Sequence, residues 1–88
     1  MEKENTPLEA TIIGNIFGVA SANTAIITYP QIIGSAEIEE DVFEIMANYW
    51  QIDQNTLNFL FTHLPMESVK EGWEGGFLDT IFPLRQYV

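Results

Sequence analysis

The sequence predicts a mainly α-helical fold, a compact bundle of about four to five short helices, with one short β element left open. Apolar residues recur at three- and four-residue spacing along most of the chain, which is typical of amphipathic helices. Capping residues, prolines and a glycine pair separate these periodic segments. With 88 residues, 47% of them hydrophobic, the chain is expected to form a single small helical domain over residues 1–88.

The first helix is expected to begin at Thr6. The segment Thr6-Pro7-Leu8-Glu9 has the spacing of a capping box, with proline at the first helical position. The apolar residues that follow share one half of the helix: Leu8, Ile12, Ile13, Ile16, Phe17, Val19 and Ala20.

Small residues occupy the other half of this helix at four-residue spacing: Ala10, Gly14, Gly18 and Ala22. Each glycine inside a helix costs roughly 1 kcal/mol relative to alanine, so a compensating role is expected. We interpret the stripe as a groove that lets another backbone approach closely. The alternative is that Gly14 or Gly18 ends a shorter helix or marks a bulge.

Residues 23–34 are rich in β-branched side chains, which favours a strand, but Pro30 interrupts any long element of either type. The chain offers few other segments with which a strand here could pair. A short helix and a turn are therefore expected.

The strongest predicted helix runs from Ala36 to about Trp50, with Ser35 as its cap. One side of this helix is apolar and the reverse side is acidic. The acidic side consists of Glu37, Glu40, Asp41 and Glu44.

Two further helices are expected. Asp53 is predicted to cap a helix over 54–64, from which Phe59 points away from the core. Pro65 then opens a short helix that the Gly75-Gly76 pair ends. That helix has a second acidic face: Glu67, Glu71 and Glu74. The apolar tail, residues 77–88, is expected to pack back on the core.

The segment from Met46 to Leu57 resembles the helix-turn-helix motif, with a small residue in its first helix, a β-branched residue in the turn and a capped second helix. It departs from the motif at Gln51, where glycine is usual. Residues 54–59 also contain no lysine or arginine that could contact phosphates.

Charge is the strongest compositional signal. Thirteen Asp and Glu residues oppose three Lys and Arg residues, for a formal net charge of −10. Direct binding to nucleic acid, or to an anionic membrane through a basic patch, is therefore disfavoured. The chain has no cysteine, which excludes disulfides and thiolate metal sites.

Residues 10–36 contain no charged side chain, yet polar residues and Pro30 interrupt the run. We therefore expect no membrane span. The N-terminal residues lack the basic region of a secretory signal, so a cytoplasmic location is expected.

Signatures of catalysis are scarce. His63 is the one histidine and has no partner residue in a triad-like pattern. The glycine-rich segment 72–76 lacks the lysine and the strand-to-helix setting of a phosphate-binding loop. We expect no enzyme activity, no metal and no cofactor.

The favoured hypothesis is a small acidic binding protein that docks on a basic partner, such as a nucleic-acid-binding protein or a nuclease, and inhibits or modulates it. The four carboxylates of 37–44 average about one per 3.5 Å along a helix, close to the charge spacing of one DNA strand. The predicted contacts are Glu37, Glu40, Asp41, Glu44, Glu67, Glu71 and Glu74, with Phe59 as an apolar anchor.

Three alternatives remain. Charge pattern alone favours interpreting the acidic faces as solvated surfaces that keep the chain soluble. A homodimer or larger assembly would self-pack through Ala10, Gly14, Gly18 and Ala22. A degenerate helix-turn-helix regulator would bind DNA in a salt-sensitive way.

Overall fold

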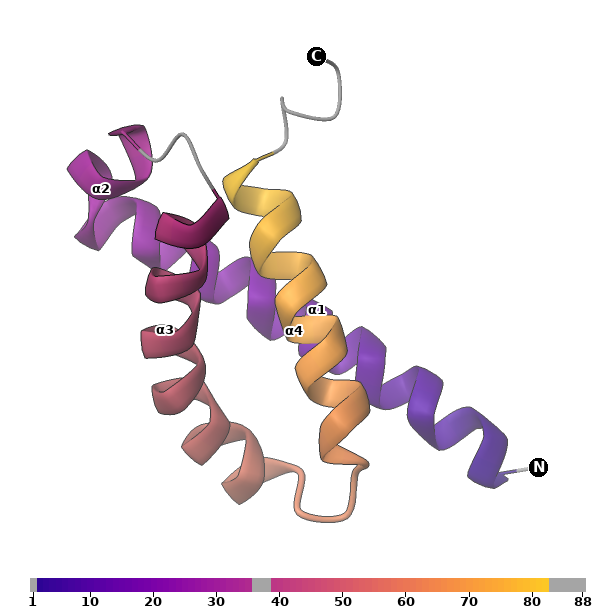
Figure 1. The fold of residues 1–88 in the computed structure, drawn as a ribbon. Helices are drawn as coiled ribbons and strands as arrows, with labels where there is room; N and C mark the ends of the chain where they lie inside the picture. Colours follow the sequence, from indigo (N-terminus) through magenta and orange to yellow (C-terminus); the bar gives the residue numbers. More distant parts are fainter. Residues whose placement is uncertain (1, 36–38, 83–88) are drawn as a thin grey trace.

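The computed structural model describes residues 2–35 and 39–82, which form four helices and no strand (Figure 1). The helices are α1 (Glu2–Thr28), α2 (Pro30–Ser35), α3 (Glu39–Leu60) and α4 (Met66–Ile81). The predicted all-α bundle is confirmed, although α1 and α3 are long helices of 27 and 22 residues.

The predicted start of the first helix was wrong. α1 begins at Glu2, and Pro7 lies inside it rather than at its first position. A proline this close to a helix N-terminus removes only one backbone hydrogen bond, so the helix tolerates it. The Thr11 hydroxyl donates to the carbonyl oxygen of Pro7 at 2.8 Å.

The expected short helix and turn lie within residues 23–35, where a bend at Tyr29 separates α1 from the short helix α2. α1 ends at Thr28, and Pro30 opens α2, where a missing backbone N–H breaks no helical hydrogen bond. The Tyr29 N–H still donates to the carbonyl oxygen of Ala25 at 2.7 Å. The predicted start of the following helix falls on residues 36–38, outside the described residues.

α1 and α4 pack more extensively than any other helix pair, and glycine makes this contact close. Gly14 and Gly18 are buried against the α4 backbone. A Cβ on Gly14 would overlap the carbonyl oxygen of Val69, and one on Gly18 would overlap that of Trp73. The sequence-based groove for a close backbone approach is therefore confirmed.

α4 contributes a matching pair of glycines. A Cβ on Gly72 would overlap the carbonyl oxygen of Thr11, and one on Gly76 would overlap that of Asn15. Asn15 also donates from Nδ2 to the carbonyl oxygen of Gly72 at 3.5 Å. Each helix thus presents a Gly-x-x-x-Gly face to the backbone of the other.

This contact corrects two predictions. Gly75-Gly76 does not end the last helix, because Gly76 lies in the contact with α1 and α4 continues to Ile81. The small-residue stripe is also not free for self-association. Its four members, Ala10, Gly14, Gly18 and Ala22, are buried, and α4 of the same chain already fills the groove at both glycines.

α3 is a single helix without the turn that a helix-turn-helix motif requires, so that prediction was wrong. Asp53 lies within α3 and is not a cap. Its half-buried carboxylate accepts hydrogen bonds from Ser21 and Trp73, and these tertiary contacts replace the predicted capping role.

Aromatic contacts attach α3 and its following loop to the α1–α4 pair. The Trp50 and Trp73 ring centroids are 5.2 Å apart, and Trp73 stacks on Phe77 at 4.9 Å. An edge-to-face contact at 5.9 Å joins Phe17 to Phe61. Trp73 and Phe77 are fully buried, so these rings form the centre of the core.

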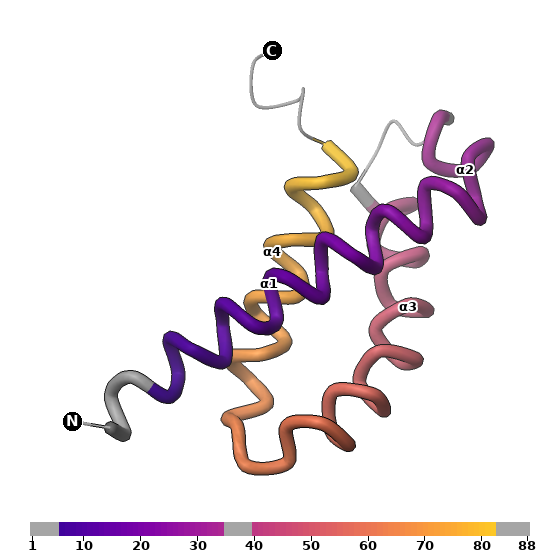
Figure 2. Tube along the Cα trace, turned by 180° about the vertical axis from the view of Figure 1, so that it is seen from behind, coloured from indigo at the N-terminus to yellow at the C-terminus, as the bar shows by residue number. Residues whose placement is uncertain are grey.

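The helices form two layers. Viewed from behind, α1 crosses in front of α4 and α3, and no described segment covers its outward side (Figure 2). α3 and α4 run antiparallel in the other layer, joined by residues 61–65 (Figure 1).

By length and composition, one described helix could cross a membrane, over Thr6–Thr28. The expectation of no membrane span stays a prediction, because the core helix of a soluble protein meets the same two criteria. In this fold, however, α4 crosses the window at Gly14 and Gly18 and carries the charged Glu71 and Glu74. A span would draw these carboxylates toward hydrocarbon unless α1 separated from α4. Length and hydropathy are therefore weak support for a membrane role.

The glycine contact predicts opposite effects for two alanine substitutions in α4. Gly72→Ala would place a Cβ against the α1 backbone and should destabilise the fold by about 1–3 kcal/mol, the range of overpacked sites. Gly75→Ala has open space around its Cβ and should stabilise by up to about 1 kcal/mol through helix propensity. Urea unfolding followed by circular dichroism measures both. Equal effects would contradict the close backbone contact.

Candidate functional site

The predicted acidic face of α3 is exposed. Glu40, Asp41 and Glu44 lie in its first two turns, while Glu37 lies outside the described residues. None of these three carboxylates has an ion-pair partner among the described side chains. Their position near a helix N-terminus is electrostatically favourable. The negative charge is therefore available to an external cation.

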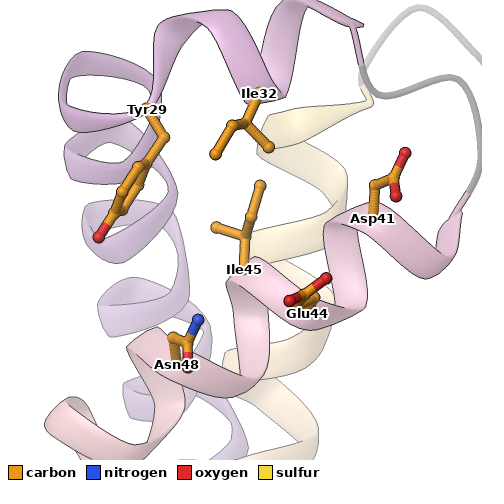
Figure 3. Close-up of a pocket in the computed structure, with 6 residues that line it drawn as sticks. All are labelled: Tyr29, Ile32, Asp41, Glu44, Ile45 and Asn48. Atoms are coloured by element: carbon orange, nitrogen blue, oxygen red, sulfur yellow. The ribbon is translucent and has the colours of Figure 1, made fainter.

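Two of these carboxylates border a pocket between α2 and α3. The pocket has a volume of about 170 Å³ and is lined by Tyr29, Ile32, Asp41, Glu44, Ile45 and Asn48. In Figure 3, Ile32 and Ile45 point toward one another, and the two carboxylates lie to one side of them. The pocket therefore has an apolar interior and an acidic edge.

The size and lining of this pocket indicate its ligand chemistry. Small-molecule sites usually enclose about 300–1,000 Å³, so a pocket of about 170 Å³ fits a single side chain better than a metabolite. Arginine and lysine combine an apolar stem with a cationic end. Such a stem could lie against Ile32 and Ile45 while its charge meets Asp41 and Glu44.

The second acidic face lies elsewhere. Glu67 and Glu71 are exposed on α4, and Glu74 is partly buried with its carboxylate 4.0 Å from the Lys70 ammonium. Because α3 and α4 are antiparallel, these residues lie near the loop end of the pair, whereas Glu40 is at the opposite end (Figure 1). The two predicted acidic sets therefore lie toward opposite ends of the α3–α4 pair.

Phe59 is exposed, with 82% of its surface accessible. It is 18 residues from Asp41, which is five helical turns, so the two share the outward face of α3 about 27 Å apart. The pocket that Asp41 and Glu44 border is lined instead by Tyr29 and Ile32 from the chain before α3. Sequence reasoning missed them because only the position of α2 over α3 brings them there.

A hydrogen-bond network links three helices beside the core. The Trp73 indole N–H donates to the Asp53 carboxylate at 2.9 Å and lies 3.1 Å from the Ser21 hydroxyl. The Ser21 hydroxyl also donates to Asp53. Serine, aspartate and tryptophan come from α1, α3 and α4, so the network joins both layers.

The Asp53 network is structural in its chemistry. Burial raises the pKa of the Asp53 carboxyl above its ordinary value, while the hydrogen bond from Trp73 acts in the opposite direction. A second pocket, of about 250 Å³, adjoins Asp53. Its lining contains no histidine, lysine or arginine that could share a proton or activate Ser21. The described residues also contain no group of three metal-ligating side chains.

We compared the chain with protein families, curated proteins and solved structures. No protein-family model matches the chain, and no curated protein or solved structure is significantly similar to it.

The raised pKa of Asp53 predicts a specific pH dependence. The folded state holds this proton more tightly than the unfolded state, so Asp53 lowers the free energy of unfolding as pH rises through its folded-state pKa. Asp53→Asn keeps an acceptor for Trp73 and removes the charge. It should be at least as stable as wild type at neutral pH, and this advantage should shrink on acidification toward the ordinary carboxyl pKa.

The matched variant for this test is Asp53→Ala, which leaves Ser21 as the remaining acceptor for the Trp73 indole. It should lose about 0.5–1.5 kcal/mol, the net contribution of a typical hydrogen bond, because the indole keeps one acceptor. Urea titrations over a pH series compare the three proteins. A stability difference between wild type and Asp53→Asn that does not change with pH would contradict the burial of this carboxyl.

Proposed function

We propose that this chain is a non-enzymatic, acidic binding protein that docks on a basic partner protein through the N-terminal half of α3. The observation that carries the proposal is the pocket at the edge of the acidic face, where unpaired carboxylates adjoin an apolar interior. We further propose that docking inhibits or modulates the partner and takes place in the cytoplasm.

The charge of the chain supports this proposal through the kinetics of encounter. A net charge of −10 attracts a positively charged surface over a distance set by ionic strength. Close to contact, exposed side chains must then hold the complex. Tyr29, Ile32 and Phe43 are each more than 40% exposed around the α3 carboxylates and supply that apolar contact.

The spacing of the α3 carboxylates favours a partner that normally binds nucleic acid. Glu40, Asp41 and Glu44 are presented on one rigid helix. Their axial spacing is a few ångströms, similar to the charge spacing of a DNA strand. A nuclease or another nucleic-acid-binding protein is therefore the proposed class of partner. Binding of DNA by this chain itself has no support, since α3 has neither the turn nor the cations of a DNA reader.

Charge reversal tests the proposal. Asp41→Lys with Glu44→Lys should lower the rate of association with a basic partner about tenfold at low salt, within the range of electrostatic steering. The salt dependence of that rate should fall as well. The partner is obtained by capture from host lysate on the immobilised wild-type chain, and its association is then measured by surface plasmon resonance.

The matched control is Glu67→Lys with Glu71→Lys, which changes the net charge equally at the other end of the α3–α4 pair. This variant should keep most of the association rate. Equal losses in the two variants would show that net charge alone governs binding. Unchanged association kinetics in both variants would indicate that the acidic faces do not contact the partner and serve only to keep the protein soluble. A partner that binds duplex DNA should also be displaced from it by the wild-type chain.

A further inference from the structure

The side of α1 opposite the glycine contact is apolar, although no segment among residues 2–35 and 39–82 covers it (Figure 2). We name this the outer stripe. Its members are Leu8, Ile12, Ile16, Val19 and Ile26, each between 37% and 62% exposed. Ile16 lies midway between Gly14 and Gly18 in sequence, two residues from each. Two residues turn a helix by about 200°, so the Ile16 side chain is on the opposite side of α1 from the glycine contact with α4. α1 is therefore apolar on two opposite sides.

Charge restricts what can cover the outer stripe. No Asp, Glu, Lys, Arg or His occurs from Ala10 to Gly34, so a basic partner finds no carboxylate there. Interfacial membrane helices carry lysine and arginine on their polar face, and this segment carries none. A second copy of the chain meets neither objection, because the two stripes carry no charge from residue 10 to residue 26, and the exposed Glu9 lies at the end of the contact.

The outer stripe is also complementary to itself. When two copies of α1 run antiparallel, Leu8 of one copy lies opposite Ile26 of the other, and Ile16 lies opposite Val19. Ile12 then faces Asn23, an exposed residue on the same side of the helix. This is the reciprocal pattern of a two-fold symmetric contact.

We propose that the outer stripe forms an antiparallel α1–α1 contact between two copies of this chain. The stripe extends over the 19 residues from Leu8 to Ile26, which is about 27 Å of helix with a width of about 10 Å. This is less than the roughly 800 Å² that each partner buries in a standard interface. The contact is therefore reversible, and the protein exchanges between monomer and dimer as concentration changes.

Sedimentation velocity of the full chain at micromolar to millimolar concentrations tests this contact. The wild-type mass should rise from one chain toward two, and added sodium chloride should favour the dimer by screening the −10 charge of each copy. Ile16→Glu would bury a charge in the contact and should weaken dimerisation at least tenfold. Phe59→Glu, an equal change at an exposed site on α3, should leave it unchanged.

The absence of native cysteine allows a test of direction. Under oxidising conditions, a mixture of Leu8→Cys and Ile26→Cys should form a disulfide-linked dimer, whereas neither variant should link efficiently alone. Circular dichroism confirms that each variant is folded. Self-linking of Leu8→Cys would overturn the antiparallel arrangement.

Two further results would overturn the proposal. One is a wild-type mass that stays monomeric at every concentration and salt level. The other is flotation of the wild-type chain with vesicles of phosphatidylcholine or of phosphatidylcholine and phosphatidylserine, which would assign the outer stripe to lipid. Because the basic-partner contact should weaken with salt and this contact should strengthen, the two proposals fail independently.

Discussion

The direct backbone contact between α1 and α4 is the constraint on which the rest of the structure depends. Four glycines let each helix touch the carbonyl oxygens of the other, and a single methyl group at Gly14 or Gly72 would separate them. This contact decides which side of α1 is inward. It also positions Trp73, whose ring packs against α3 and whose indole N–H reaches Asp53. The third long helix is thus attached through groups that the glycine contact has placed.

The fold separates two surfaces of different chemistry. α1 is uncharged over most of its length and exposes aliphatic side chains, whereas α3 and α4 carry unpaired carboxylates. A chain of 88 residues hides only about 60–65% of the surface that it exposes when unfolded, so such apolar exposure is expected in part. The small size of the chain does not, however, explain why the exposed apolar side chains form one continuous side of a helix. We propose a cationic partner for one surface and a second copy of the chain for the other, and salt should affect these two proposed contacts in opposite directions.

The sequence predicted which segments are helical more accurately than it predicted the residues at which each helix begins and ends. Periodic apolar residues located the helical segments, and Pro30 and Pro65 marked real boundaries. Local end signals failed wherever a tertiary contact overrode them. Gly76 was predicted to end a helix but lies in a helix–helix contact. Asp53 was predicted to cap a helix but accepts a hydrogen bond from the buried Trp73 indole. At the candidate site, the exposure of the α3 carboxylates agrees with the prediction, while Tyr29 and Ile32 were missed.

The sequence by itself determined the all-α class, the acidic surface and the need for a close contact along the small-residue stripe, since composition and helical periodicity are local properties of the chain. Only the tertiary structure decided what fills that stripe. Alanine and glycine spacing specifies that a backbone can approach but carries no information about which one. The same holds for the pocket of Asp41 and Glu44, to which Tyr29 and the α2 residue Ile32 contribute apolar side chains. Contacts between distant segments depend on the relative positions of whole helices, which no single segment encodes.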